Sequence, residues 1–371
     1  MLSTEYDVLS DGTRRLAEVK LRLYTQLVTR SRQRTATETD IFCESFRFVK
    51  SVDSGGLAQM QRLLQFGQVL SRSLWSREQN VRNLAVQAGD GDDGTVSVSP
   101  PDERTCKPHW SLARTWLLQP GLPGFVAAED TDVDVVVLDI EDGLPDALKA
   151  EGRRTVAEWL HDGGSAWVRI NSATSPQWND DLAALASAPG LAGVMLAKAE
   201  FADDVVATAA RLPAGTPIVA LIESALGVEY ALDIARCCSR IAFGIGDFRR
   251  DTGMSADPAV LAYPRARLVI ASRAAGLPAP IDGPTLRDQS RHLARETEIA
   301  KAAGMTGRLC LDADHAETIN TLLSPSALEV DEARDTLARL DEPTGPYDGS
   351  AGPTRARAEA VLDLAAKLGV R

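Results

Sequence analysis

DVVVLDIEDG, residues 134–143, is the stretch that decides the fold, because a run of β-branched and apolar residues ends there in a group of acids. Such a run is typical of a buried strand in a parallel sheet. Asp139, Glu141 and Asp142 stand at its end, and carboxylates are costly to bury unless they are paired or bind metal. The stretch therefore predicts a buried strand whose carboxyl end carries chemistry.

Seven further runs of this kind alternate with helical stretches. The eight expected strands are Arg114–Gln119, Asp134–Ile140, Ala166–Asn171, Gly193–Lys198, Pro217–Glu223, Arg240–Gly246, Ala279–Asp282 and Gly307–Leu311. The helices expected between them include Ala147–Leu160, Asp203–Arg211, Tyr230–Cys237, Tyr263–Ala275 and Thr285–Ala303. Eight βα units predict an α/β fold, a (β/α)8 TIM barrel. A doubly wound open sheet is the alternative, but the turn GLPGF at 121–125 is not the GxGxxG loop typical of that fold.

Polar residues end five consecutive strands of this barrel. They are Asp139, Glu141 and Asp142 on the second strand, Arg169 and Asn171 on the third, Lys198 on the fourth, Glu223 on the fifth and Asp247 on the sixth. Because the carboxyl ends of barrel strands meet at the face that carries active sites, we expect these side chains to gather there.

Glu223 and Asp247 come from neighbouring strands, so their carboxylates can converge on one cation. Two carboxylates, completed by water and substrate oxygens, suit Mg²⁺. The alternative is that one or both pair with Arg169 or Lys198. Arg169 offers a planar fork for a substrate carboxylate, or for an ion pair with the acids of the second strand. Lys198 is a candidate Schiff-base nucleophile, but a metal site makes an imine unnecessary.

Residues 1–105 differ in character from the rest of the chain. Helical spacing of apolar residues predicts helices over roughly Thr13–Ser31 and Gly56–Val86, and the composition of residues 88–105 predicts a linker. We expect a helical extension that packs on the barrel or on another subunit. A partner-binding module is the alternative.

Composition narrows the class of protein. The net charge of −12 arises after residue 105, which disfavours nucleic acid as a partner. No apolar run reaches membrane-spanning length, and the N-terminus has no secretory pattern. The five cysteines show no CxxC spacing, which indicates reduced thiols in the cytoplasm. The four histidines form no HExxH pair, so the expected metal ligands are carboxylates.

Five motifs in order carry a family resemblance. They are RTWLLQPG (114–121), VVVLDIEDGLPDALKAEGR (135–153), VRIN (168–171), ALIES (220–224) and GIGDFRRDTG (244–253). From residue 114 to about residue 320 the chain resembles the citrate lyase β-subunit-like branch of the HpcH/HpaI aldolase superfamily. The segments at 324–340 and 347–362 are similar to that family's C-terminal arm, which often covers a neighbouring subunit's site. The resemblance implies a homo-oligomer, a trimer. Together with the change in composition near residue 105, it divides the chain into an extension with linker (1–105), a barrel (106–325) and an arm (326–371).

The resemblance also implies an activity, the making or breaking of a carbon–carbon bond by a retro-aldol or Claisen-type step. The substrate would be a hydroxyacyl-CoA or a related hydroxy or keto acid, and the cofactor Mg²⁺. The implied roles are metal binding by Glu223 and Asp247, carboxylate binding by Arg169, substrate contact by Arg114, and catalytic orientation of these groups by Asp139 and Glu141.

Three departures from the family pattern keep other functions open. The GLPGF turn lacks basic residues that hold the phosphates of CoA, which favours a CoA-independent keto-acid aldolase as one alternative. The eighth strand reads LCLDADHAETIN (309–320), which puts Asp312 and His315 where relatives commonly have Ile-His-Pro. The arm's DGSAGP (348–353) lacks a Val-Asp pair, for which Asp348 is the candidate substitute. A catalytically silent barrel that acts as a binding or assembly subunit is the other alternative, and the general base is unassigned.

Overall fold

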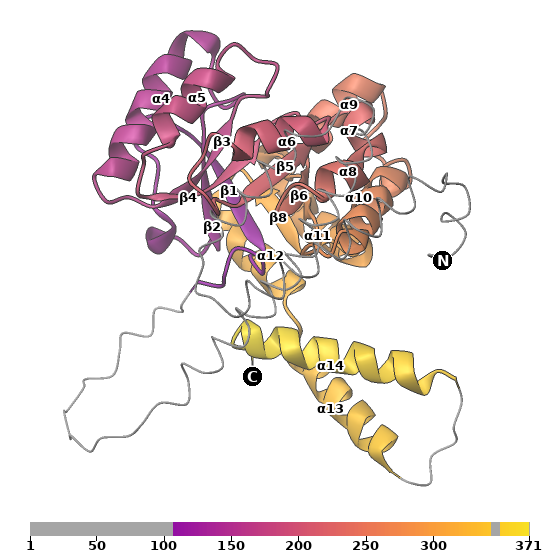
Figure 1. The fold of residues 1–371 in the computed structure, drawn as a ribbon. Helices are drawn as coiled ribbons and strands as arrows, with labels where there is room; N and C mark the ends of the chain where they lie inside the picture. The colour runs from indigo at the N-terminus through magenta and orange to yellow at the C-terminus, as the bar shows by residue number, and fades with distance from the viewer. Residues whose placement is uncertain (1–106, 343–348, 371) are drawn as a thin grey trace, which may run out of the picture. The chain divides into compact units, whose positions relative to one another are not determined.

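The computed structural model describes residues 107–342 and 349–370 (Figure 1). The helices and the linker expected within residues 1–105 lie outside these residues, and so does Asp348.

Eight parallel strands close into a barrel in chain order, and β1 pairs with β8. The strands are β1 (Thr115–Pro120), β2 (Val135–Asp139), β3 (Ala166–Ile170), β4 (Leu191–Leu196), β5 (Ile218–Ile222), β6 (Arg240–Phe243), β7 (Ile281–Asp282) and β8 (Gly307–Cys310). The predicted (β/α)8 barrel is therefore confirmed.

Helices connect and surround the strands. They are α4 (Asp146–His161), α5 (Trp178–Leu185), α6 (Ala202–Ala209), α7 (Ala225–Glu229), α8 (Ala231–Ala235), α9 (Ile245–Thr252), α10 (Ala262–Ala274), α11 (Leu293–Ala302) and α12 (Ala316–Leu323). Short 3₁₀ turns lie at η2 (Ala128–Asp130), η3 (Arg287–His292) and η4 (Ala313–His315). In the described part, no helix is both long enough and apolar enough to span a bilayer.

Alternation along the strands divides the apolar residues between two layers. On β2, Val135 and Val137 belong to the cluster inside the barrel, whereas Val136 and Leu138 belong to the cluster between sheet and helices. Inside, Trp116 of β1 and Trp167 of β3 meet edge to face with ring centroids 5.0 Å apart. The densely packed interior holds the strand ends, and hence the site, in fixed positions.

Several element boundaries differ from the sequence expectation, among them the following three. Strand β6 ends at Phe243, so Asp247 lies in the first turn of α9 rather than at a strand end. The helix expected over Tyr230–Cys237 is the shorter α8, and a further short helix, α7, precedes it and ends before Tyr230. The helix expected over Thr285–Ala303 begins as the turn η3 before α11. Apolar periodicity identifies the buried face of a helix but fixes its ends poorly.

Two helices, α13 (Ala327–Asp341) and α14 (Ala351–Lys367), follow the barrel and pack against each other. Helix α13 starts with a capping box, in which the Ser326 and Glu329 side chains accept from each other's backbone N–H groups. This helix pair lies within the segment expected to form the C-terminal arm.

Candidate active site

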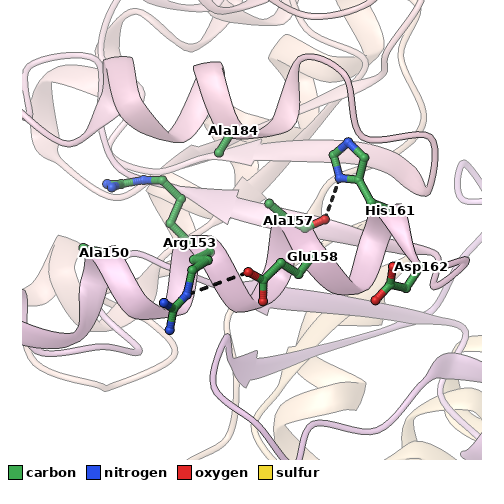
Figure 2. Close-up of a pocket in the computed structure, with 8 residues that line it drawn as sticks. Ala150, Arg153, Ala157, Glu158, His161, Asp162 and Ala184 are labelled. Carbon is green, nitrogen blue, oxygen red and sulfur yellow. Dashed lines mark hydrogen bonds and ion pairs between the residues drawn. The ribbon is translucent and has the colours of Figure 1, made fainter.

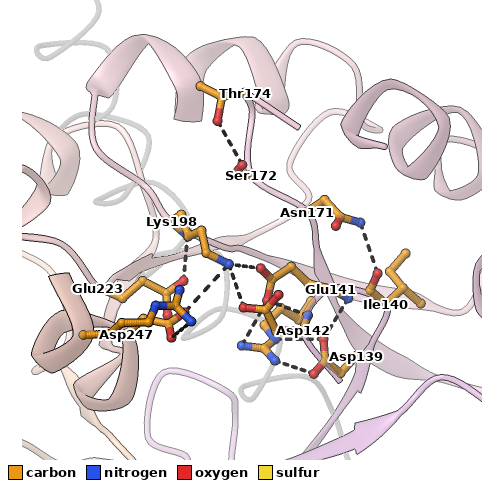
Figure 3. A network of polar contacts seen from close by, with 12 residues as sticks. Asp139, Ile140, Glu141, Asp142, Asn171, Ser172, Thr174, Lys198, Glu223 and Asp247 are labelled. Carbon is orange, nitrogen blue, oxygen red and sulfur yellow. Dashed lines mark hydrogen bonds and ion pairs between the residues drawn. The ribbon is translucent and has the colours of Figure 1, made fainter. Parts of the chain in front are cut away.

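The polar strand-end residues gather at the carboxyl end of β2 to β6, as the barrel topology requires. Figure 3 shows side chains from β2 and its following turn facing those that follow β4, β5 and β6. Parallel register brings the first pair together, since Asp139 and Arg169 are direct neighbours across β2 and β3.

Arg169 is held by the two acids of the second strand. Its Nε donates to Asp139 Oδ1 at 2.8 Å, its Nη2 bonds Asp139 Oδ2, and its Nη1 lies 3.4 Å from Glu141 Oε2. Burial alone would lower the pKa of Arg169, but these carboxylates outweigh it and the pKa lies above its usual value. The arginine is thus a fixed cation, and Nη1 and Nη2 each keep a further N–H for a ligand carboxylate.

Asp139 is itself held in place by the residues that follow β2. Its Oδ1 accepts from the Glu141 backbone N–H at 2.9 Å. Gly143 approaches it so closely that a Cβ at this position would lie 2.3 Å from Asp139 Oδ2. A glycine after DIED is therefore part of what orients Arg169.

Lys198 lies among the carboxylates rather than apart from them. Its Nζ bonds Glu141, lies 2.8 Å from Asp142 Oδ2 and 3.8 Å from Asp247 Oδ2. Burial lowers the pKa of Lys198, but the hydrogen bonds to Asp142 and Glu141 outweigh burial and raise it above the usual value. A lysine held as ammonium is a poor nucleophile, which argues against the Schiff-base alternative.

Glu223 and Asp247 stand side by side in Figure 3, Glu223 directly after β5 and Asp247 in the first turn of α9, which follows the neighbouring strand β6. Glu223 Oε1 accepts from the Lys198 backbone N–H at 2.8 Å, and Asp247 Oδ1 lies 3.2 Å from Arg250 Nη1. Burial raises the pKa of the buried Glu223 carboxyl to about 8; Arg169 opposes this, and the Asp247 and Glu141 carboxylates add to it. Two close, mutually repelling carboxylates are typical of a cation site.

The donor set fits a hard dication. Five carboxylates (Asp139, Glu141, Asp142, Glu223 and Asp247) share three cationic side chains (Arg169, Lys198 and Arg250). Oxygen donors with an excess of negative charge are what Mg²⁺ prefers. Within residues 107–342 and 349–370, no three His, Cys, Asp or Glu side chains are grouped so as to hold a metal unaided. A metal on Glu223 and Asp247 would therefore need water and substrate oxygens as well.

The structure does not bring Arg114 to this site. Arg114 immediately precedes β1, so it lies at the amino end of the barrel. Its Nε and Nη2 each donate to the buried Asp134 carboxylate at 2.9 Å, and its Nη1 donates to Ser324 Oγ at 2.7 Å. Arg114 is therefore far from the strand-end residues, because a residue before a strand and a residue after it lie at opposite ends of a barrel.

Asn171 and Asp312, two further polar residues at strand ends, form hydrogen bonds that stabilise the local fold. Asn171 is buried. Its Oδ1 accepts a hydrogen bond from Lys149 Nζ, and its Nδ2 donates to the Ile140 carbonyl and to Asp181 Oδ2. Asp312 caps the turn η4 by accepting from the Asp314 N–H at 3.2 Å.

His315 is buried beside the carboxyl end of β8. Its Nε2 lies 2.9 Å from Ser290 Oγ.

Sequence reasoning missed Arg250 and Gly244. Arg250 lies one helical turn after Asp247, a spacing that indicates a pair once α9 is known to begin at Ile245. A Cβ on Gly244 would lie 2.3 Å from Glu223 Oε2, a tertiary contact that no local signal announces.

A separate hollow of about 580 Å³ lies on the outer helical layer, against α4 and α5 (Figure 2). Its lining includes Arg153, Glu158 and His161 of α4 and Ala184 of α5. None of the strand-end residues contributes to it.

With this geometry in place, comparison with known proteins identifies the family. Residues 126–313 match the family model of HpcH/HpaI aldolase/citrate lyase, and residues 328–369 match that of the HpcH/HpaI aldolase C-terminal domain. The first match alone covers half of the chain. The protein belongs to the HpcH/HpaI aldolase/citrate lyase family.

Relatives with curated names are carbon–carbon lyases. Citrate lyase subunit beta of Leuconostoc mesenteroides subsp. cremoris is 31% identical over 252 residues, which cover 62% of this chain and 83% of that protein. L-malyl-CoA/beta-methylmalyl-CoA lyase of Cereibacter sphaeroides is 28% identical over 258 residues, covering 58% and 80%. This HpcH/HpaI family chain is therefore a carbon–carbon lyase, as the sequence predicted.

A solved structure supports the same grouping. The structure of CitE from Mycobacterium tuberculosis in complex with magnesium, acetoacetate and coenzyme A is 27% identical, with a TM-score of 0.59. It covers 69% of this chain and 99% of the CitE chain. The likeness extends over nearly the whole of that protein.

Proposed function

We propose that this family member is a Mg²⁺-dependent lyase that cleaves or forms a carbon–carbon bond in a hydroxyacyl-CoA or a related hydroxy or keto acid. The observation that carries the proposal is the convergence of Glu223 and Asp247 at one end of the barrel (Figure 3), linked to Arg169 through Lys198 and Glu141. Glu223 and Asp247 would hold the metal, and Arg169 the substrate carboxylate.

Relatives support the choice of metal and substrate class. The Mycobacterium tuberculosis CitE structure contains magnesium, acetoacetate and coenzyme A, and the Cereibacter sphaeroides relative acts on malyl-CoA. The carboxylate-rich site of this chain has the oxygen donors that such a metal requires.

Some residues of the site would bind the substrate or the metal, and others hold these binding side chains in position. Asp139 fixes Arg169 through two bonds, so the remaining N–H groups of the guanidinium present a preorganised fork to a carboxylate. The Lys198 backbone N–H fixes Oε1 of Glu223, which leaves Oε2 as the oxygen that can turn to a ligand. A dication held by Glu223 and Asp247 would supply Lewis-acid polarisation of the substrate carbonyl.

One observation favours a CoA-independent keto-acid substrate as the second candidate. The turn after β1 reads GLPGFVAAED over residues 121–130 and carries no basic side chain. A CoA pyrophosphate at this turn would find no cation. Profiling with CoA thioesters and with free keto acids separates the two candidates.

Calorimetry of Mg²⁺ with oxaloacetate or pyruvate tests the proposal on wild type, Glu223→Gln and Asp247→Asn. We expect metal-dependent keto-acid binding in wild type and its loss in both variants, since each replaces an ionisable carboxyl ligand by a neutral amide without changing its size. Asp233→Asn is the matched control, because Asp233 is an exposed carboxylate paired with Arg236 on the outer helix α8. Absence of Mg²⁺ binding in wild type would overturn the metal-dependent mechanism proposed here.

A further inference from the structure

Lys198 joins carboxylates from three strand ends of the barrel. Its ammonium contacts Glu141 and Asp142 after β2 and lies 3.8 Å from Asp247 after β6. Its backbone N–H donates to Glu223 after β5 at 2.8 Å. Figure 3 shows this side chain between the two acidic groups.

The backbone of Lys198 is in the left-handed region, with φ 49°. Among the described residues it is the one non-glycine residue with a positive φ. This region is unfavourable for a side chain with a Cβ, and such outliers persist where surrounding bonds determine them. Here the Lys198 backbone N–H donates to Glu223 and the side-chain ammonium contacts Glu141, so both the backbone and the side chain of Lys198 are held by carboxylates of the site.

The Lys198 ammonium and a dication at the proposed metal site would both interact with the Asp247 carboxylate. Asp247 is one of the two proposed metal ligands, and Lys198 Nζ already lies within ion-pair distance of it. Like charges that share a carboxylate repel each other, most strongly where solvent is partly excluded. The Lys198 side chain is 34% exposed, so this repulsion is only partly screened.

We propose that Lys198 is a positioning residue that sets the metal affinity of the site. Its backbone N–H aims Glu223, and its ammonium balances the acidic cluster and weakens the binding of a dication at Asp247. The inference rests on the proposed function, since it takes Glu223 and Asp247 as the metal ligands. It predicts moderate, exchangeable Mg²⁺ binding in this chain, where an uncompensated cluster would bind more tightly.

The test is calorimetry of Mg²⁺ alone with wild type, Lys198→Met, Lys198→Gln and Lys198→Arg. We expect the two neutral variants to bind Mg²⁺ about tenfold more tightly, because they keep the N–H but lose the competing charge. Lys198→Arg retains the charge and should bind as wild type does. Lys301→Met is the control, since Lys301 pairs with Glu329 on α13 and forms no part of the site.

Thermal unfolding with and without Mg²⁺ supplies a readout that does not depend on activity. The metal-free neutral variants should unfold at a lower temperature than wild type, and Mg²⁺ should raise their midpoint by more than it raises that of wild type. Two neutral variants are used so that misfolding of one leaves the other as the test.

The outcomes separate this inference from the proposed function. Unchanged or weaker Mg²⁺ binding in a folded neutral variant, with binding intact in wild type, overturns the role of Lys198 alone. Absence of Mg²⁺ binding in wild type overturns both.

Discussion

Gly244→Ala should damage the proposed metal site without replacing any charged residue. Gly244 has φ −85° and ψ 80°, so alanine is not excluded by the backbone. The obstacle is Glu223, because a Cβ on residue 244 would lie 2.3 Å from its Oε2 and 2.5 Å from its Cβ.

The magnitude follows from those two contacts. Each must lengthen by roughly 1 Å to become an ordinary van der Waals contact in a densely packed site. Swinging the Glu223 carboxylate relieves only the first contact, since the second involves the Cβ next to the backbone of β5. We expect a loss of about 1–3 kcal/mol in the free energy of unfolding from overpacking. We also expect Mg²⁺ affinity to fall about tenfold to hundredfold, as when a group that orients a metal ligand is displaced.

Gly246→Ala is the matched control two residues along. A Cβ at Gly246 meets nothing within 4 Å, and the residue lies exposed in the first turn of α9. Alanine there should leave Mg²⁺ affinity unchanged and stabilise the helix by about 0.5–1 kcal/mol. Calorimetry of Mg²⁺ and urea unfolding of both variants give the comparison. Equal Mg²⁺ affinity in Gly244→Ala and Gly246→Ala would refute the assignment of Glu223 as a metal ligand whose position requires glycine at residue 244.

Two further predictions concern arginines that lie away from the site. Arg240→Met should lower the free energy of unfolding by about 3 kcal/mol or more, because the fully buried guanidinium donates hydrogen bonds to the backbone carbonyls of Trp110, Ala113 and Ala279, and these bonds would be lost. Urea unfolding measures the change, and a loss below 1 kcal/mol would contradict that account. Arg114→Met should lower the thermal unfolding midpoint by leaving buried Asp134 without its ion pair, yet leave keto-acid affinity in calorimetry unchanged. A large loss of keto-acid affinity at unchanged stability would instead restore the substrate role expected from the sequence.

Two arrangements at the site could not have been predicted from the sequence. The left-handed backbone of Lys198 depends on carboxylates that arrive from β2, β5 and β6. The contact between Gly244 and Glu223 depends on the distance between two strands. Both are properties of side chains that are far apart in the chain and meet only after the barrel closes.

The sequence by itself determined the barrel and the group of residues at its carboxyl end. Alternation of apolar runs with helical stretches is a local property, and the parallel course of strands places every strand end at one face. The sequence alone therefore places Asp139, Arg169, Lys198, Glu223 and Asp247 at one end of the barrel. Only the tertiary structure decided how they pair, because ion pairing depends on distances of a few ångströms between strands. It also decided that Arg114 lies at the opposite end, since a residue that starts a strand is separated from the site by the length of that strand.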